Sequence, residues 1–218
     1  MIKAVVFDMD GVLFDTERLC KECYCQIAKE LHLPDMDKVF DTFIGRNVVD
    51  TKRMFEEHYI EQVSFDEFDE MTSALARRRK QEEGIPVKKG VRELLEFLKN
   101  KGFHIGLASS TRREKILEML EATGISEYFE TVIAGDMVKH SKPDPEIYLL
   151  ACEGLRVKPE EAYAIEDSFN GIRSAHRAGM KPIMVPDLLS PDSEMRELSF
   201  CICDDLLKVL EEKSLWQV

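Results

Sequence analysis

Apolar and polar residues alternate in two different ways along the chain, and the change between them divides the sequence. Residues 2–7 are a short apolar run rich in β-branched side chains, which indicates a buried strand. Between residues 16 and 86, apolar side chains recur every three or four positions, as on the buried face of a helix. After residue 86, helical patterns alternate with short apolar runs. We therefore expect a strand, an inserted helical block, and then an alternating helix and strand unit.

The helical block has its own start and stop signals. Apolar stripes predict helices at residues 19–31, 39–44 and 47–59. Ser64, followed three residues later by Glu67, predicts a capping box at the start of a fourth helix. Gly84 and Pro86 end the block, because neither residue favours a continuing helix.

The remaining sequence predicts a parallel sheet. Further strands are expected at residues 103–108, 130–134, 162–165, 180–185 and 200–203. Helices are expected at residues 90–100, from a cap at Thr111 and Glu114 to about Gly124, from Pro145 onward, and at residues 168–178. Strands that alternate with helices are typical of a doubly wound α/β fold covered on both faces. The predicted fold is therefore a Rossmann-like parallel sheet, residues 1–15 and 87–218, with an all-helical cap domain inserted at residues 16–86.

The charge of the chain restricts its partners. The 218 residues include 30 basic and 42 acidic side chains, which gives a net charge of -12. Such a surface repels nucleic acid and anionic membranes, so neither is an expected partner. No apolar run reaches the length of a membrane span, and the first residues do not resemble a signal peptide. We expect a cytoplasmic monomer or weak dimer whose six cysteines are reduced.

Polar side chains follow four of the predicted strands or lie in the loops after them. The four sets are Asp8 with Asp10, Ser109 with Ser110 and Thr111, Lys142, and Glu166 with Asp167. Taken singly, each set has an ordinary explanation as a turn, a helix cap, a surface lysine or a helix N-terminus. In a doubly wound sheet, however, ligands bind beyond the carboxyl ends of the strands. The fold therefore predicts that all four sets meet at one edge.

Carboxylates that meet at one edge need a positive partner. At 4 Å, two like charges repel by about 1 kcal/mol in water and about 4 kcal/mol near a protein surface. Lys142 alone would not offset several such repulsions and a phosphate as well. Oxygen ligands favour a hard cation, and Mg²⁺ is typically bound by one or two carboxylates together with phosphate. The sequence places no histidine or cysteine cluster at these strand ends, which argues against zinc.

Four motifs resemble those of the haloacid dehalogenase superfamily. They are D-x-D-G-V-L-F-D-T at 8–16, Ser109 at a strand end, K-P-D-P at 142–145 and E-D-S at 166–168. The order and spacing are closest to the branch with a helical cap after the first motif. That branch contains sugar-phosphate phosphatases, phosphoglycolate phosphatases and β-phosphoglucomutase.

The resemblance implies an activity and a role for each polar set. It implies a magnesium-dependent phosphatase that acts on a small phosphorylated metabolite, such as a sugar phosphate, through an aspartyl-phosphate intermediate. Asp8 would be the nucleophile and Asp10 the general acid and base. The implied metal set is Asp8, Asp10 through its main-chain carbonyl, Asp167, and Glu166 in support. The implied phosphate-binding set is Ser109, Ser110 and Lys142. Because dehalogenases of the superfamily lack an acid at position 10, Asp10 argues against dehalogenation.

The cap offers fewer signals. Arg46 and Asn47 are candidates for substrate specificity, although a helix N-terminal turn explains them equally well. Cys20 and Cys23 lie on an apolar stripe, so we interpret them as packing residues rather than metal ligands. His140 is close enough to Lys142 in sequence to contact the site.

Three other functions stay open. A β-phosphoglucomutase activity is the main alternative, although Cys20 and Val48 stand near the positions where that enzyme type carries a histidine and an arginine. A non-catalytic module that binds phosphorylated ligands would have to bury several carboxylates without using them, which is costly. A receiver-type signalling domain also uses an aspartate on a doubly wound sheet, but the D-x-D pair and the inserted cap argue against it.

Overall fold

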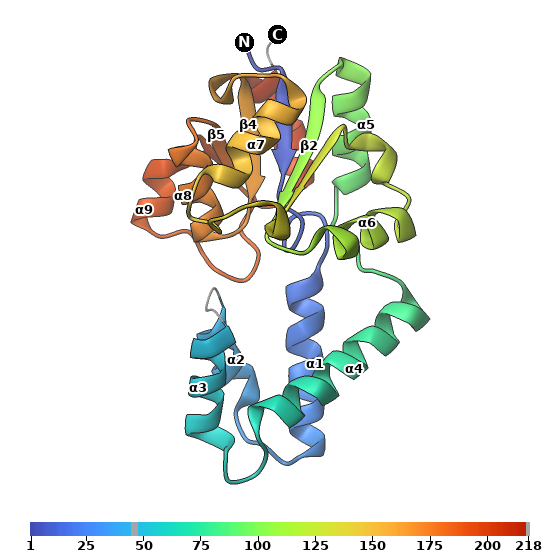
Figure 1. The fold of residues 1–218 in the computed structure, drawn as a ribbon, viewed down its shortest axis with the longest axis vertical. Helices are drawn as coiled ribbons and strands as arrows, with labels where there is room; N and C mark the ends of the chain where they lie inside the picture. Colours follow the sequence, from blue (N-terminus) through green and yellow to red (C-terminus); the bar gives the residue numbers. More distant parts are fainter. Residues whose placement is uncertain (45–47, 217–218) are drawn as a thin grey trace. The chain divides into compact units, whose positions relative to one another are not determined.

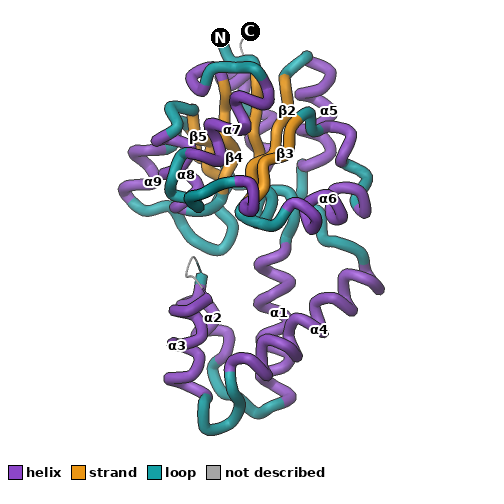
Figure 2. The backbone as a smooth tube through the Cα atoms, viewed as in Figure 1, coloured by secondary structure: helices purple, strands orange, loops and turns teal. Residues whose placement is uncertain are grey.

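A computed structural model describes residues 1–44 and 48–216 of the chain. The chain divides into two compact units. One consists of Met1–Asp15 and Val87–Val218, and the other is Thr16–Pro86. All the strands lie in the first unit, and the described residues of the second form helices joined by turns (Figures 1 and 2).

The first unit is built on a parallel sheet of six strands. They are β1 Ala4–Phe7, β2 His104–Ser109, β3 Thr131–Ala134, β4 Ala162–Glu166, β5 Lys181–Met184 and β6 Cys201–Ile202. Their order in the sheet is β3-β2-β1-β4-β5-β6, and every neighbouring pair is parallel. Phe7 pairs with Leu107 on one side and Ile165 on the other. The carboxyl ends of β2, β1 and β4 therefore lie next to one another, and the predicted doubly wound α/β fold is confirmed.

Helices cover both faces of this sheet. They are α5 Val91–Lys101, α6 Arg113–Ala122, α7 Glu146–Leu155, α8 Phe169–Arg177, α9 Ser193–Leu198 and α10 Leu206–Glu211. Short 3₁₀ segments occur at Ser126–Tyr128, Gly135–Met137, Pro159–Glu161 and Lys213–Trp216. Ala4 and Val6 of β1 pack in one cluster with residues of α7 and α8. Successive strand side chains point to opposite faces, and on the other face Phe7 meets Phe129 edge to face, with 6.2 Å between the ring centroids.

The two chain segments that flank the insertion are held to each other. Phe14 forms an antiparallel bridge with Val87, and the Lys88 N–H donates to the Leu13 carbonyl at 2.9 Å. The ammonium of Lys88 also pairs with the buried carboxylate of Asp187, in the loop after β5, at 2.5 Å. The chain therefore leaves the sheet unit and returns to it at adjacent, anchored positions.

The helical unit has a small aromatic core. Its helices are α1 Thr16–Glu30, α2 Met36–Phe43, α3 Val48–Tyr59 and α4 Phe65–Glu83. Tyr24 of α1 meets Phe40 of α2 and Phe68 of α4, with ring centroids 5.1 and 5.0 Å apart. The predicted capping box is confirmed: Ser64 accepts the Glu67 N–H, and the Glu67 carboxylate accepts the Ser64 N–H.

The structure also bears on the predictions about the cysteines and about membrane spans. Cys23 is buried, whereas Cys20 is only half-buried, and the six cysteines are free thiols. In the described part of the chain, every helix is too short or too polar to cross a membrane.

Candidate active site

Asp8 and Lys142 form the centre of the polar cluster at the carboxyl edge. Asp8 directly follows β1, is buried, and its N–H donates to the Ile165 carbonyl at 2.9 Å. The side chain of Lys142, in the loop between β3 and α7, is only 6% exposed. Its ammonium donates to Asp8 Oδ1 at 2.5 Å, to Glu166 Oε1 at 2.7 Å and to the Ala108 carbonyl at 2.9 Å. The Tyr148 hydroxyl oxygen is a fourth, more distant acceptor at 3.5 Å. An ammonium has three protons, so the three nearer acceptors can use all of them.

Glu166, the last residue of β4, is the most buried carboxylate of the cluster, at 0% exposure. Its Oε1 accepts from Lys142 at 2.7 Å and from the Tyr148 hydroxyl at 2.8 Å. Its Oε2 accepts the N–H and the hydroxyl of Ser168, at 3.2 and 3.0 Å. Gly171 lies directly against the carboxylate, because a Cβ built there would be 1.8 Å from Oε1. With four hydrogen bonds, both oxygens of Glu166 are fully used.

A set of carboxylate oxygens suitable for a cation lies beside this pair. One oxygen each from Asp8, Glu166 and Asp167 falls within 4.8 Å of the others. Gly11 has a φ of +79°, and a Cβ there would be 2.3 Å from Asp167 Oδ2. Glycine is therefore required for the loop after β1 to approach Asp167 so closely. An all-oxygen acidic set fits a hard cation such as Mg²⁺, which these three carboxylates could hold.

The loop after β2 contributes the polar residues on the other side of Asp8. Ser109 is 1% exposed, and its hydroxyl oxygen accepts the Thr111 N–H at 3.1 Å. The neighbouring Ser110 is exposed, and its carbonyl lies so close to Gly135 that a Cβ on that glycine would be 2.1 Å away. The Thr111 hydroxyl donates to Asp10 Oδ2 at 2.9 Å.

The predicted capping role of Thr111 is wrong. The residue that precedes α6 is Arg112, whose side chain makes no capping hydrogen bond. The N–H of Arg113, the first residue of α6, donates to Asp136 Oδ1 at 3.1 Å. The Thr111 hydroxyl is instead bonded to Asp10. A threonine three residues before a glutamate can cap a helix or can bond a distant carboxylate. The sequence pattern is the same for both, so it could not tell them apart.

Burial and like charges raise the pKa of Asp8. Burial is the main cause, the charges of Glu166 and Asp10 add to it, and Lys142 opposes it, so that the pKa rises to about 8. Burial disfavours the charged form of Lys142, but the carboxylates of Asp8 and Glu166 outweigh it and raise the pKa of that ammonium. The cluster therefore carries more negative charge than Lys142 balances, and a divalent cation would restore the ionised form of Asp8.

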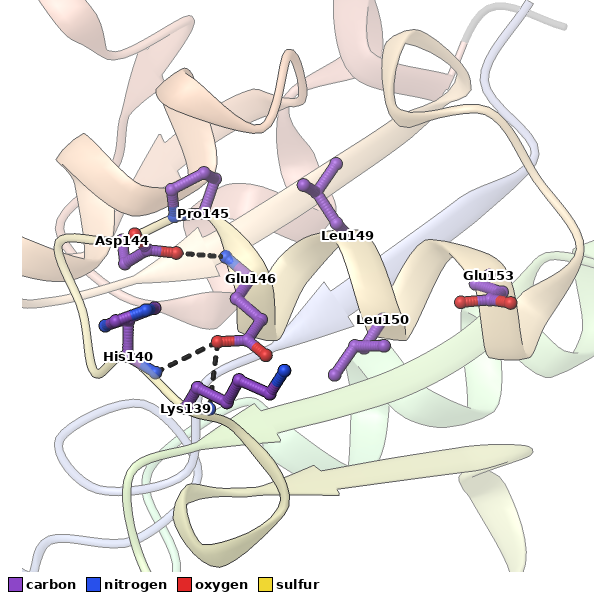
Figure 3. Close-up of a pocket in the computed structure, with 8 residues that line it drawn as sticks. All are labelled: Lys139, His140, Asp144, Pro145, Glu146, Leu149, Leu150 and Glu153. Atoms are coloured by element: carbon purple, nitrogen blue, oxygen red, sulfur yellow. Dashed lines mark hydrogen bonds between the residues drawn. The ribbon is translucent and has the colours of Figure 1, made fainter.

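The segment before Lys142 is fastened by the first residue of α7. Glu146 Oε2 accepts the N–H groups of Lys139 and His140, both at 2.9 Å, and Asp144 Oδ1 accepts the Glu146 N–H at 3.0 Å. Figure 3 shows these contacts beside a cavity of about 320 Å³. His140 is exposed and lines this cavity. The hydrogen bonds of Glu146 thus hold the loop that delivers Lys142.

The structure brings most of the predicted site residues to one edge, as the strand order requires. Lys142 contacts Asp8 and Glu166, and one carboxylate oxygen each from Asp8, Glu166 and Asp167 lies within 4.8 Å of the other two. Thr111 links Ser109 and Asp10 to each other. Arg46 and Asn47 lie outside the described residues. Sequence reasoning missed Tyr148, which belongs to an apolar stretch of α7 that gives no sign of a polar contact, and Gly171, which looks like an ordinary helix residue.

Comparisons with known proteins agree with this arrangement. A profile of the haloacid dehalogenase-like hydrolase family matches residues 5–185, more than half of the chain. A phosphorylated carbohydrates phosphatase of Thermotoga maritima is 37% identical over 182 residues, which are 84% of each chain. The crystal structure of CbbY from Rhodobacter sphaeroides in complex with phosphate is 26% identical, with a TM-score of 0.72 over 96% of both chains.

A third comparison bears on the fold alone. The crystal structure of a β-phosphoglucomutase from Clostridium difficile is 23% identical, with a TM-score of 0.72 over 100% of this chain and 96% of that one. The family assignment rests on the family profile and on the Thermotoga maritima relative. The chain belongs to the haloacid dehalogenase-like hydrolase family, in the branch of phosphoglycolate phosphatases and β-phosphoglucomutase, and is a phosphoric monoester hydrolase.

Proposed function

We propose that the protein is a magnesium-dependent phosphatase that hydrolyses a small phosphorylated metabolite, most simply a sugar phosphate, through a phosphorylated Asp8. One observation carries the proposal. Lys142 donates a hydrogen bond to Asp8 Oδ1, and one oxygen each from Asp8, Asp167 and Glu166 lies within 4.8 Å of the other two. In this proposal, residues 1–15 and 87–218 are the catalytic core and residues 16–86 are the cap.

In the first step, a carboxylate oxygen of Asp8 attacks phosphorus while the bond from phosphorus to the leaving oxygen breaks. Asp10 gives its proton to that leaving oxygen, and Thr111 orients the Asp10 carboxyl group for the transfer. Lys142 keeps the Asp8 carboxylate fixed and balances its charge. The hydroxyl of Ser109 and main-chain N–H groups around Ser110 receive the phosphate oxygens.

In the second step, a water molecule attacks the phosphorus of the aspartyl phosphate. Asp10, now ionised, takes a proton from this water, and the bond between phosphorus and Asp8 breaks to release inorganic phosphate. When bound, Mg²⁺ supplies positive charge against the phosphate and the carboxylates. Asp8, the main-chain carbonyl of Asp10 and Asp167 would hold the ion, with Glu166 behind them.

The proposed substrate class rests on the name of a relative. The Thermotoga maritima relative is named for phosphorylated carbohydrates, which makes sugar phosphates the first candidates. Phosphoglycolate and pyrophosphate are the next compounds to test. Arg46 and Asn47 are proposed to select the leaving group, so Arg46→Ala and Asn47→Ala should change KM values across a substrate panel more than they change the value of kcat.

The decisive experiment measures phosphate release from a panel of sugar phosphates, phosphoglycolate and pyrophosphate, with Mg²⁺ or with a chelator. We expect release only with Mg²⁺, and a loss of about 10²- to 10⁴-fold in Asp10→Asn and at least as large a loss in Asp8→Asn. Asp204→Asn is the matched control, because Asp204 is an exposed aspartate in the loop between β6 and α10, and it should retain full activity. Release that persists in Asp8→Asn would overturn the assigned nucleophile.

The same panel separates hydrolysis from isomerisation. If no compound releases phosphate but glucose 1-phosphate is converted to glucose 6-phosphate, the protein is a mutase. If neither reaction occurs while Mg²⁺ and phosphate still bind, a binding function replaces the catalytic one.

A further inference from the structure

Tyr148 reaches the centre of the polar cluster from α7, although no sequence motif includes it. Its side chain is 0% exposed. Its hydroxyl donates to Glu166 Oε1 at 2.8 Å, the same oxygen that accepts from Lys142 at 2.7 Å. The Lys142 nitrogen also lies 3.5 Å from the Tyr148 hydroxyl oxygen and 5.0 Å from the centre of the Tyr148 ring, within the range of a cation–π contact. Tyr148 therefore contacts both Glu166 and Lys142.

The Tyr148 hydroxyl determines whether the Glu166 carboxylate has a lone pair free for another partner. A carboxylate oxygen has two lone pairs. Ser168 occupies both positions on Oε2, and Lys142 and Tyr148 occupy both positions on Oε1. Without the Tyr148 hydroxyl, one lone pair of Oε1 would be open to a cation or to water.

We propose that Tyr148 is a positioning residue, whose hydroxyl keeps Glu166 as the anchor of Lys142 and not as a ligand of the metal. Lys142 gives one proton each to Asp8, Ala108 and Glu166. A Glu166 carboxylate that could rotate would no longer hold the ammonium toward Asp8. Because Tyr148 is fully buried, it acts through Lys142 and does not touch a substrate. Its effect on turnover rests on the proposed phosphatase function.

The first test compares Tyr148→Phe with wild type, using p-nitrophenyl phosphate and Mg²⁺. The substitution keeps the ring and removes only the hydroxyl. We expect kcat to fall about tenfold, as for the loss of one hydrogen bond to a charged group, while KM stays within twofold. Tyr163→Phe is the matched control, because the Tyr163 hydroxyl is also buried but donates to the Leu215 carbonyl at 3.3 Å. It should leave both constants within twofold.

The second test does not depend on activity. In protein without metal or substrate, the ammonium group of Lys142 is followed by ¹H–¹⁵N NMR, and its signal is assigned by its loss in Lys142→Met. Because its protons are buried and bonded, their exchange with water is slow in wild type. We expect exchange to be about tenfold faster in Tyr148→Phe and unchanged in Tyr163→Phe.

The two tests separate the two proposals. If exchange is faster in Tyr148→Phe but wild type releases no phosphate, the positioning role is supported and the proposed phosphatase function is rejected. Active wild type with equal kcat and equal exchange in Tyr148→Phe would overturn the positioning role. A lower melting temperature with kcat and exchange unchanged would overturn it too, because the hydroxyl would then serve stability alone.

Discussion

Thr111 donates a hydrogen bond from its hydroxyl to Oδ2 of Asp10 at 2.9 Å, and so joins the loop after β2 to the loop after β1. The two residues are separated by 101 positions in the sequence. The contact gives the carboxyl group of Asp10 a fixed orientation, which a proton donor to a leaving oxygen needs. The neighbouring Ser109 holds Thr111 in turn, by accepting its N–H at 3.1 Å.

Replacing Thr111 by valine should impair catalysis with little effect on folding. Valine has the shape of threonine but cannot donate to Asp10. We expect kcat to fall about tenfold, since a hydrogen bond to a charged group is lost, and the melting temperature to change little. Thr123→Val is the control, because the Thr123 hydroxyl bonds only carbonyl groups at the end of α6. Equal kcat values in Thr111→Val and Thr123→Val would contradict the orienting role of Thr111.

The stability of the metal-free protein should increase as the pH falls from 8 to 6. Burial raises the pKa of Asp8 to about 8, whereas an aspartate in an unfolded chain titrates near 4. Between these values the folded state binds more protons than the unfolded state, so lowering the pH favours folding. The measurement is the free energy of unfolding in denaturant at pH 6, 7 and 8, with a chelator present.

Asp8→Asn isolates this contribution, because the amide does not titrate. Other groups also change charge between pH 6 and 8, and those far from Asp8 contribute equally to both proteins. We expect Asp8→Asn to lose less stability than wild type between pH 6 and pH 8. Identical pH dependence in the two proteins would show that Asp8 does not take up a proton in this range.

Gly171→Ala should destabilise the protein, although alanine is normally the better helix residue. In an exposed helix interior, this change would add about 1 kcal/mol of stability. Here the new Cβ would lie 1.8 to 2.1 Å from the carboxylate atoms of Glu166. Glu166 would have to move and release Lys142, so we expect lower stability and a loss of activity. Asn170→Ala, at the exposed neighbouring position of α8, should cost less than about 0.5 kcal/mol.

Loss of the Lys88 ammonium should cost much more stability than loss of an exposed one. The side chains of Lys88 and Asp187 are 19% and 3% exposed. Lys88→Met leaves the Asp187 charge buried without this partner, which typically costs about 3 kcal/mol. Lys208 and Glu211 form a comparable pair at 2.6 Å, but they are 56% and 62% exposed, so Lys208→Met should cost less than about 1 kcal/mol. Urea unfolding of the two variants gives the comparison, and similar losses would contradict it.

The sequence predicted the sheet and the edge where the polar residues meet. Short apolar runs predicted the six strands. A polar residue directly after such a run, such as Asp8, also predicted where the strand ends. The capping box at Ser64 was also predictable, because both of its hydrogen bonds are local. The short helices α9 and α10 were not predicted, since each has only six residues and a periodic pattern needs more turns than that.

The hydrogen-bond partners within the site could not be predicted in the same way. The strand order explains why Asp8 and Glu166 are neighbours, but not why the oxygens of Glu166 are all used. That depends on Tyr148, Ser168 and Gly171, which come together only through the packing of α7 and α8 on the sheet. Lys142 was expected at this edge because it lies in the loop after a predicted strand, but its role beside Asp8 was implied only by the resemblance of its motif to that of a family.

The bridge between Phe14 and Val87 brings together the two points where residues 16–86 leave and rejoin the sheet unit. The two ends of this segment are hydrogen-bonded neighbours in the sheet unit whatever lies between them. Closing a long insertion between such ends adds little entropic cost beyond that of a short one, because the cost grows only with the logarithm of the length. Evolution could therefore lengthen, replace or recombine this segment without disturbing Asp8 and its neighbours, so that selectivity could diverge while the phosphoryl chemistry stayed the same.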